Sequence, residues 1–376
     1  MFSIDVMTAL VVIAFGNSYL IETRHAPASY PAYALGIYGL VKLLTAPAGG
    51  WLLDRVRVVL TIGLVYASEA TGLLIILVTG TANGFLVGVA FLSAGVALAW
   101  LLVFHALGDA FEADVRASAT AYVGLVSAGA TGAGFGLAAV LGQIDFWQSA
   151  FLLALGLATG TALLMLRLHP RGGRAGFGRQ QPKSAPAPPS IGHRKQLVAG
   201  VVIFAHFFAV TATIAVFGPF VLRSLHLSLL RAGILLLPAS GAAALSMLLM
   251  GRISRHGKRF GQVAALYALG AAAILAAAFV HQAWLFAFVA IPLAVAIGGA
   301  QPLLNASVLD VSHANESRGA VLGWLFFAEG LGSVAGPLLI GLVISTASIR
   351  DAVLALSLLE GAIVVLALYA ARTTRI

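Results

Sequence analysis

The chain has 376 residues, of which 60% are hydrophobic and 9% are charged. A soluble domain carries about 25% charged residues, so this composition excludes an ordinary water-soluble protein and indicates one that lies in a membrane. The net charge of +9 would fit a nucleic-acid-binding protein, but the basic residues fall in short segments between apolar runs, where the positive-inside rule places them. There is no cysteine, which excludes disulfides, thiolate chemistry and cysteine-ligated metals.

Apolar segments long enough to cross a bilayer fill most of the chain. A spanning helix needs about 20 apolar residues, and these runs lack the apolar and polar alternation of a membrane barrel. We therefore predict an all-α integral membrane protein. The twelve predicted spans are, within a few residues, 5–22, 31–53, 58–79, 84–108, 117–141, 146–167, 197–222, 232–251, 261–281, 284–308, 319–345 and 351–371.

One connection between the spans is much longer than the others. Residues 169–195 are rich in Pro, Gly, Ser and Arg, a composition that predicts a flexible cytoplasmic linker. The linker separates an N-terminal six-helix bundle, 1–168, from a C-terminal six-helix bundle, 196–376. All but five of the 22 Lys and Arg residues fall in segments on the same side of the membrane as the linker. The positive-inside rule therefore predicts a multi-pass protein of the cell (inner or plasma) membrane with both termini in the cytoplasm.

Two charged turns interrupt the apolar sequence at corresponding places in the two halves. The first is Gly50-Trp-Leu-Leu-Asp54-Arg55, and the second is Ser254-Arg-His-Gly257-Lys-Arg259. Further charged segments follow the fourth and the tenth spans, from Asp109 to Arg116 and from Asp310 to Arg318. Glycine-rich stretches, 129–136 and 330–336, lie in the next helices. This repetition indicates a duplicated membrane protein.

These motifs resemble those of the major facilitator superfamily of secondary transporters, whose signature loop reads Gly, three residues, Asp and Arg. The resemblance implies twelve transmembrane helices in two pseudo-symmetric six-helix bundles. It also implies a cytoplasmic gate that includes Gly50 and Asp54, with Asp54 facing the N-terminal end of helix 11. In the same gate Arg55 pairs with an acid at the end of helix 4, here Asp109. The alternative is a plain topogenic loop, whose charges only fix the orientation of the chain.

In that family, helices 1, 4, 7 and 10 line the substrate cavity near the middle of the membrane. The residues that match these positions, with Tyr38 added from helix 2, are Asn17, Tyr19, Tyr38, Trp100, His206, Phe207, Gln301 and Asn305. They predict a mostly neutral pocket with aromatic walls, which suits an amphipathic or weakly polar solute. They also have a purely structural interpretation, because Asn and Gln in membrane helices often bond a neighbouring helix.

Ionisable residues at bilayer depth are costly and are therefore candidates for function. Lys42 lies twelve residues before Asp54, and Glu69 twelve residues after Arg57, so both are about 18 Å from the cytoplasmic turn. Lys42 can form a static ion pair with Glu69, or it can pair with Glu329 of the other half. We hypothesise that Glu329 is the proton-coupling acid and that Lys42 is its exchangeable partner. Glu360 lies at similar depth on the twelfth span, which the resemblance implies is peripheral, and we expect it to have a local partner.

The leading functional interpretation is a proton-coupled secondary transporter of a small organic solute that works by alternating access, with efflux slightly preferred. One alternative is an uptake carrier for organic anions that uses Lys42 as its anchor. Another is a transport-inactive membrane scaffold or sensor. An enzyme is not expected, because the sequence lacks a nucleophile and base constellation, a zincin motif and a phosphate loop. The expected partners are the solute, protons and the lipid bilayer. Neither a cofactor, a metal nor a nucleic acid is expected, and a monomer is sufficient.

Overall fold

A computed structural model describes most of the predicted spans. The described residues are 20, 24–25, 30–56, 58–141, 148–168, 193–220, 224–227, 229–254, 258–313 and 318–374. The first predicted span and the cavity candidates Asn17 and Tyr19 lie outside these ranges, apart from residue 20, and so does nearly all of the predicted linker.

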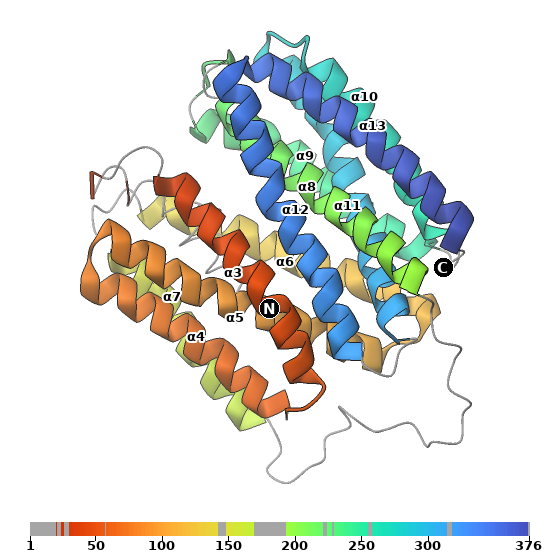
Figure 1. The fold of residues 1–376 in the computed structure, drawn as a ribbon. Coiled ribbons are helices and arrows are strands. Elements are labelled where there is room, and N and C mark those ends of the chain that lie inside the picture. The colour runs from red at the N-terminus through yellow and green to blue at the C-terminus, as the bar shows by residue number, and fades with distance from the viewer. Residues whose placement is uncertain are drawn as a thin grey trace. The chain divides into compact units, whose positions relative to one another are not determined.

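Every element in the described ranges is an α-helix (Figure 1). The helices are α3 (Tyr30–Leu53), α4 (Val58–Thr79), α5 (Ala82–Ala110), α6 (Ala113–Leu141), α7 (Gln148–Leu168), α8 (His193–Pro219), α9 (Leu229–Ile253), α10 (Arg259–Ala277), α11 (Ala283–His313), α12 (Arg318–Thr346) and α13 (Ile349–Thr374). Each predicted span from the second onward corresponds to one of them.

Eight of the described helices are long and apolar enough to cross a membrane. Several of them contain prolines, among them Pro292 and Pro302 of α11 and Pro337 of α12. A proline removes one hydrogen bond inside a helix, but packed membrane helices tolerate this because neighbouring groups satisfy the freed backbone. The helical fold therefore follows from the need to pair every backbone polar group in hydrocarbon.

The described residues form two compact units. Unit 1 contains Met1–Asp109, Val126–Pro188 and Ser317–Phe327, and unit 2 contains Ala110–Leu125, Pro189–Glu316 and Ala328–Ile376. Helices α6 and α12 therefore begin in one unit and continue in the other. The division of the chain at the predicted linker stays a prediction.

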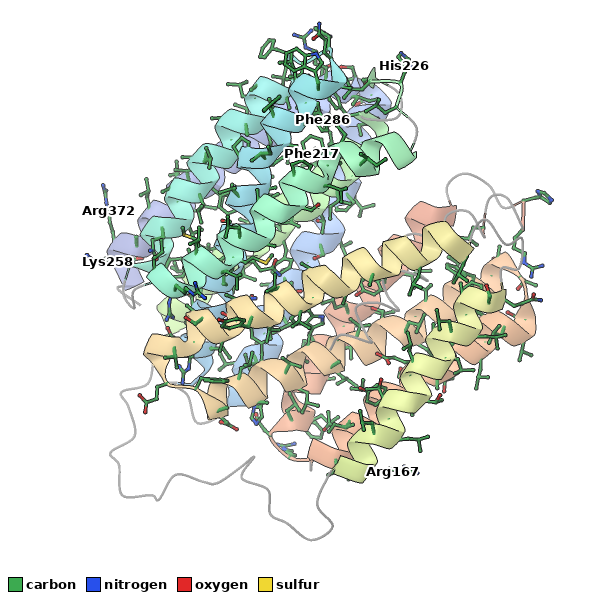
Figure 2. The ribbon with its side chains drawn as sticks, turned by 180° about the vertical axis from the view of Figure 1, so that it is seen from behind. Arg167, Phe217, His226, Lys258, Phe286 and Arg372 are labelled. Atoms are coloured by element: carbon green, nitrogen blue, oxygen red, sulfur yellow. The ribbon has the colours of Figure 1, made fainter. Side chains whose placement is uncertain are left out.

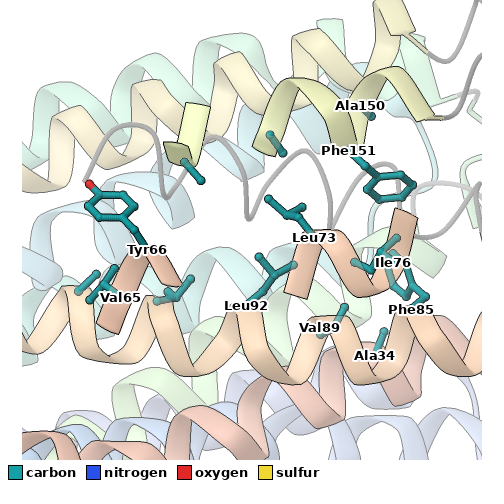
Figure 3. Close-up of a cluster of buried hydrophobic side chains, with 14 of the residues drawn as sticks. Ala34, Val65, Tyr66, Leu73, Ile76, Phe85, Val89, Leu92, Ala150 and Phe151 are labelled. Carbon is teal, nitrogen blue, oxygen red and sulfur yellow. The ribbon is translucent and has the colours of Figure 1, made fainter. Parts of the chain in front are cut away.

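The core of unit 1 forms where α4, α5 and α7 meet (Figure 3). Phe85 and Phe151 point toward each other in this cluster, with their ring centroids 6.2 Å apart in an edge-to-face arrangement. Helices α4 and α5 approach each other closely at Gly72, where an added Cβ would lie 2.5 Å from the carbonyl oxygen of Gly88. Small residues allow such close packing in lipid, where dispersion contacts hold helices together.

In unit 2, α10 packs along α11 and α13, and α13 also contacts α8 (Figure 1). Phe217 of α8 and Phe286 of α11 meet edge to face, with ring centroids 5.3 Å apart (Figure 2). His226 lies at this end of unit 2, while Lys258 and Arg372 lie at the opposite end (Figure 2). The two basic residues that the sequence places on one side of the membrane thus lie at one end of the unit.

Candidate functional site

The end of α3 meets the start of α12 within unit 1. The carboxylate of Asp54 accepts hydrogen bonds from the backbone N–H groups of Gly319, at 2.8 Å, and Ala320, at 3.0 Å. The first N–H groups of a helix have no partner inside the helix, and they form the positive end of its dipole. Asp54 therefore caps α12. α12 corresponds to the eleventh predicted span, so Asp54 lies at the helix end that the family resemblance implies. The role of Asp54 in gating stays a prediction.

Glycines allow the backbones of α3 and α12 to touch at this junction. A Cβ added to Gly50 would overlap the carbonyl oxygen of Gly319 and would lie 2.9 Å from the Cα of Gly323. A Cβ added to Gly323 would lie 2.8 Å from the carbonyl oxygen of Ala46. Gly50 was expected here from the signature loop, whereas Gly319 and Gly323 were not predicted. Their spacing of four residues is a pattern of close helix packing, and it could have revealed them.

The other two residues of the predicted gate have different neighbours. The guanidinium carbon of Arg55 lies 4.3 Å from the centre of the Trp51 ring, a cation–π arrangement. The carboxylate of Asp109 lies 3.6 Å from Nε2 of His105, one turn earlier on α5. Arg55 and Asp109 are both exposed residues of unit 1. Their pairing with each other stays a prediction.

A corresponding junction occurs in unit 2, between the end of α9 and the start of α6. A Cβ added to Gly251 would lie 2.5 Å from the Cβ of Ala121 and 3.0 Å from the carbonyl oxygen of Ala117. The hydroxyl of Ser118 donates a hydrogen bond of 2.8 Å to the carbonyl oxygen of Gly251. The repeated helices therefore meet in the same close manner in both units, with different polar contacts.

Beside this second junction, one buried carboxylate bonds to two arginines. Asp310 of α11 accepts a hydrogen bond of 2.9 Å from Arg116 of α6 with one oxygen, and accepts one from Arg259 of α10 with the other. The exposed fractions are 7% for Asp310, 5% for Arg116 and 1% for Arg259. The sequence showed these residues as parts of charged loops but not as neighbours, because they are far apart along the chain.

Each arginine of this triad makes a further contact. Nε of Arg116 donates to the carbonyl oxygen of Phe111 at 3.0 Å. Nε of Arg259 donates to the hydroxyl of Ser254 at 3.2 Å. Buried charges are tolerated only when their hydrogen-bonding groups are satisfied. The triad therefore joins α6, α10 and α11 at the end of unit 2 that holds Lys258.

The cavity candidates in the described ranges lie on α3, α5, α8 and α11. In unit 1, the carbonyl oxygen of Tyr38 accepts a hydrogen bond from Ser93, and the ring of Trp100 lies 5.9 Å from that of Phe104. In unit 2, Gln301 and Asn305 are half-buried on α11. The part that these residues play in binding a solute stays a prediction.

His206 and Phe207 of α8 belong to unit 2. Phe207 is half-buried, and its ring meets that of His206 edge to face at 4.9 Å. His206 is only 1% exposed, and its Nδ1 forms a hydrogen bond with the hydroxyl of Tyr267 on α10. His206 thus lies in the packed interior between two helices of its own unit.

The ionisable residues at bilayer depth are mostly buried. Glu69 on α4 is 1% exposed and packs against Gly95 of α5, where an added Cβ would lie 2.7 Å from the Cγ of Glu69. Glu329 on α12 is 8% exposed, and Lys42 on α3 is half-buried. The pairing of Lys42 with Glu69 or with Glu329 stays a prediction.

The expectation of a local partner for Glu360 is wrong as far as hydrogen bonds are concerned. Glu360 is 0% exposed, and neither of its carboxyl oxygens has a hydrogen-bonding partner among the described residues. The reason is that the residues around its carboxyl group on α10 and α11 include Gly270 and Ala296, which carry no polar side chain. Among the residues that the structure describes, no cluster of His, Asp and Glu fits a metal ion.

Comparisons with known proteins agree with this arrangement. The chain matches the family model described as Major Facilitator Superfamily over residues 1–337 and again over 204–375. No curated protein sequence matches it. Its fold is similar to that of the human organic anion transporter MFSD10 (TETRAN), with a TM-score of 0.77 at 16% identity over 97% of both chains.

A second solved structure, the transporter FucP in its outward conformation, has a TM-score of 0.68 at 14% identity, and the alignment covers 98% of this chain and 97% of FucP. The E. coli fucose:proton symporter FucP gives a TM-score of 0.67 at 14% identity over 98% of both chains. At these identities the solved structures show the fold, and the family model covers most of the chain. The chain belongs to the Major Facilitator Superfamily, and is therefore a multi-pass membrane transporter and not an enzyme.

Proposed function

We propose that this chain is a proton-coupled secondary transporter of a small organic solute, and that it favours export over uptake. Membership of the superfamily supports secondary transport by alternating access. The observation that carries the proton coupling is the position of Glu329, which is 8% exposed in the middle of the apolar helix α12.

At this depth the charged and the neutral form of a carboxyl group differ greatly in free energy. The charged form is expensive in hydrocarbon, whereas the neutral acid is tolerated. A conformation that buries Glu329 therefore favours the bound proton, and one that hydrates it favours release. A proton can shift the balance between two access states only by this difference in affinity. Lys42, half-buried on α3, is the proposed partner of the charged form.

The junction between α3 and α12 supplies the proposed cytoplasmic gate. The two hydrogen bonds from α12 to Asp54 and the glycine contact at Gly50 stabilise the conformation in which these helix ends touch. We expect this contact to separate when the transporter opens toward the cytoplasm. The preference for export rests on the apolar character of the candidate cavity, which includes Trp100 and Phe207, and on a signature loop that resembles those of antiporters.

A carrier of organic anions is the second candidate, and Lys42 is the residue that favours it. A lysine at bilayer depth can anchor a carboxylate, as a point charge with three donors. One of the structures with a similar fold is described as an organic anion transporter, which agrees with this candidate at the level of fold. In this case Lys42 binds the solute and is not the partner of Glu329.

Transport by reconstituted protein tests the leading proposal. Solutes are first found by thermal shift, because binding stabilises the folded protein in proportion to the logarithm of occupancy. Liposomes are then assayed for accumulation driven by a pH gradient and for exchange of labelled solute without a gradient. Glu329→Gln should abolish gradient-driven accumulation and retain exchange. Glu69→Gln, a matched change at another buried glutamate, should retain both.

The same assays separate the two candidates. Stabilisation by lipophilic cations that is lost in Glu329→Gln supports proton-coupled export. Stabilisation by carboxylates that is lost in Lys42→Ala and kept in Glu329→Gln shows a carrier of anions instead. Gradient-driven accumulation that survives Glu329→Gln unchanged contradicts the proposed coupling.

A further inference from the structure

Unit 2 contains a second set of buried titratable groups, which the proposed coupling does not use. His206 of α8, Tyr267 of α10 and Glu360 of α13 are 1%, 1% and 0% exposed. His206 and Tyr267 share a hydrogen bond. Each residue is at least eight positions from either end of its helix, so all three lie within the membrane. They come from α8, α10 and α13, and α13 packs against both of the other helices.

The carboxyl group of Glu360 fits into a notch in the surface of α10. The notch exists because residue 270 is a glycine: an added Cβ there would overlap Oε2 of Glu360 and would lie 3.2 Å from the Cβ of Ala296. Gly270 follows Tyr267 by three residues, so the two lie on the same face of α10. The carboxyl group of Glu360 thus lies about one helical turn along α10 from the backbone position of Tyr267.

Neither oxygen of Glu360 receives a hydrogen bond from the described residues. The nearest hydroxyl on α13, that of Ser357, donates its hydrogen to the carbonyl oxygen of Ala271 at 3.0 Å. A bare carboxylate in such surroundings would cost several kcal/mol or more, whereas the neutral acid costs far less. A metal cation would need several oxygen ligands, and the notch is lined by Gly270 and Ala296.

Other titratable groups on these helices lie near the helix ends. Arg259 begins α10 and bonds to Asp310. Near the start of α13, Arg350 lies over the ring of Phe279, and Asp351 bonds to Ser348. The remaining ones are Tyr369 and Arg372, both exposed near the end of α13, and His193, Arg194 and Lys195 in the first turn of α8. Tyr267 and His206 are therefore the titratable residues of α8 and α10 that lie at the depth of Glu360.

We propose that Glu360 is a proton-binding site inside the membrane, distinct from Glu329, and that Tyr267 and His206 form the path by which its proton exchanges. The proton is carried on one carboxyl oxygen of Glu360. To leave, it passes to the hydroxyl oxygen of Tyr267 once a side-chain movement brings the two groups into hydrogen-bonding contact, while the hydroxyl hydrogen of Tyr267 passes to Nδ1 of His206. The products are the Glu360 carboxylate, a neutral tyrosine and a protonated histidine, so one proton has moved from Glu360 to His206.

Infrared spectroscopy of the full chain in lipid nanodiscs tests the first part of the proposal. A protonated carboxyl group without a hydrogen bond gives a carbonyl stretching band at the high-frequency end of the acid region. This band should be present in the unsubstituted protein and absent in Glu360→Gln. It should remain in Glu329→Gln and in Glu69→Gln. A band that survives Glu360→Gln, or the absence of any such band in the unsubstituted protein, overturns the assignment.

A second variant covers the case in which Glu360→Gln does not fold. Glu360→Asp keeps the acid but withdraws it from the notch at Gly270, so the band should move in frequency. An unchanged band in Glu360→Asp overturns the assignment. These spectra need no solute. An absent band would therefore leave the role proposed for Glu329 intact, and a transport assay that contradicts that role would leave the Glu360 site intact.

The exchange path is tested by transferring the same sample into deuterated buffer. The Glu360 band shifts as its proton is replaced by deuterium, and the rate of this shift measures proton exchange. Tyr267→Phe should slow the exchange at least several-fold, because it removes the hydroxyl that relays the proton. Tyr66→Phe, a matched change at a buried tyrosine of unit 1, should leave the rate unchanged. Equal rates in Tyr267→Phe and the unsubstituted protein overturn the path.

Discussion

Oδ1 of Asp54 lies 2.8 Å from the backbone nitrogen of Gly319, a residue 265 positions further along the chain. The same carboxylate also bonds to Ala320, so one side chain satisfies two N–H groups of the first turn of α12. Loss of such a cap typically costs about 0.5–2 kcal/mol. A contact of this size is strong enough to bias the proposed gate toward the conformation in which the two helix ends touch, and weak enough to break when that gate opens.

We predict that Asp54→Ala lowers the thermal stability of the purified protein by about 0.5–2 kcal/mol, because two N–H groups of α12 lose their acceptor. Asp54→Asn keeps a side-chain acceptor and should lose less, which separates the cap from the charge. Thermal unfolding in one detergent measures both variants. Equal losses in the two variants would show that the charge of Asp54, and not its capping geometry, stabilises the junction.

The second prediction concerns Gly50. In Gly50→Ala the new methyl group would overlap the carbonyl oxygen of Gly319, so the ends of α3 and α12 must move apart, at a cost of about 1–3 kcal/mol. Gly36→Ala is the control on the same helix, because nothing lies within 4 Å of its added Cβ. Cross-linking of cysteines introduced near the two helix ends should fall in Gly50→Ala only. Equal yields in both variants would contradict the contact.

A third prediction concerns the buried triad. Asp310→Asn leaves Arg116 and Arg259 facing each other without a counter-charge, and removing one member of a buried ion pair costs about 3–5 kcal/mol. We expect a large fall in the unfolding temperature or in the yield of folded protein. Asp351→Asn, at an exposed acid of α13, should change either quantity little. A similar effect of both substitutions would contradict the stabilising role of the triad.

The fourth prediction concerns the packing of α12 against α8 within unit 2. A Cβ added to Gly332 would overlap the carbonyl oxygen of Phe204 and lie 2.9 Å from the backbone nitrogen of Phe208. We expect Gly332→Ala to destabilise the protein by about 1–3 kcal/mol. Gly341→Ala on the same helix has open space around the new methyl group and should be nearly neutral. Thermal unfolding of the pair decides whether the glycines of α12 are needed for packing.

The helices were predictable because hydropathy reports where a segment can lie in lipid. The predicted span 58–79 coincides with α4, whose ends are set by a charged turn and a glycine with φ of 57°. The predicted span 284–308 is shorter than α11, which continues to His313. The extension contains Asp310, whose charge ends an apolar window in the sequence but is paired with two arginines in the structure.

The site was predictable only where a local motif carries it. Asp54 stands in a recognisable loop, and its partner helix followed from the family resemblance. The contacts of Asp310 and of Tyr267 join residues that are between 51 and 194 positions apart, and nothing local in the sequence pairs them. The lack of a hydrogen-bonding partner for Glu360 among the described residues was also not predictable, because it depends on the small residues that surround the carboxyl group on other helices.

The two helix junctions differ in how they should respond to dissolved salt. The junction at Asp54 depends on an exposed carboxylate at a helix end, an interaction that ions weaken over a Debye length of about 8 Å at physiological ionic strength. Its counterpart at Gly251 depends on a neutral hydroxyl and on packing, which ions barely affect. The two junctions of this duplicated architecture thus depend on different interactions. Raising the ionic strength should loosen the junction at Asp54 and leave the one at Gly251 in place.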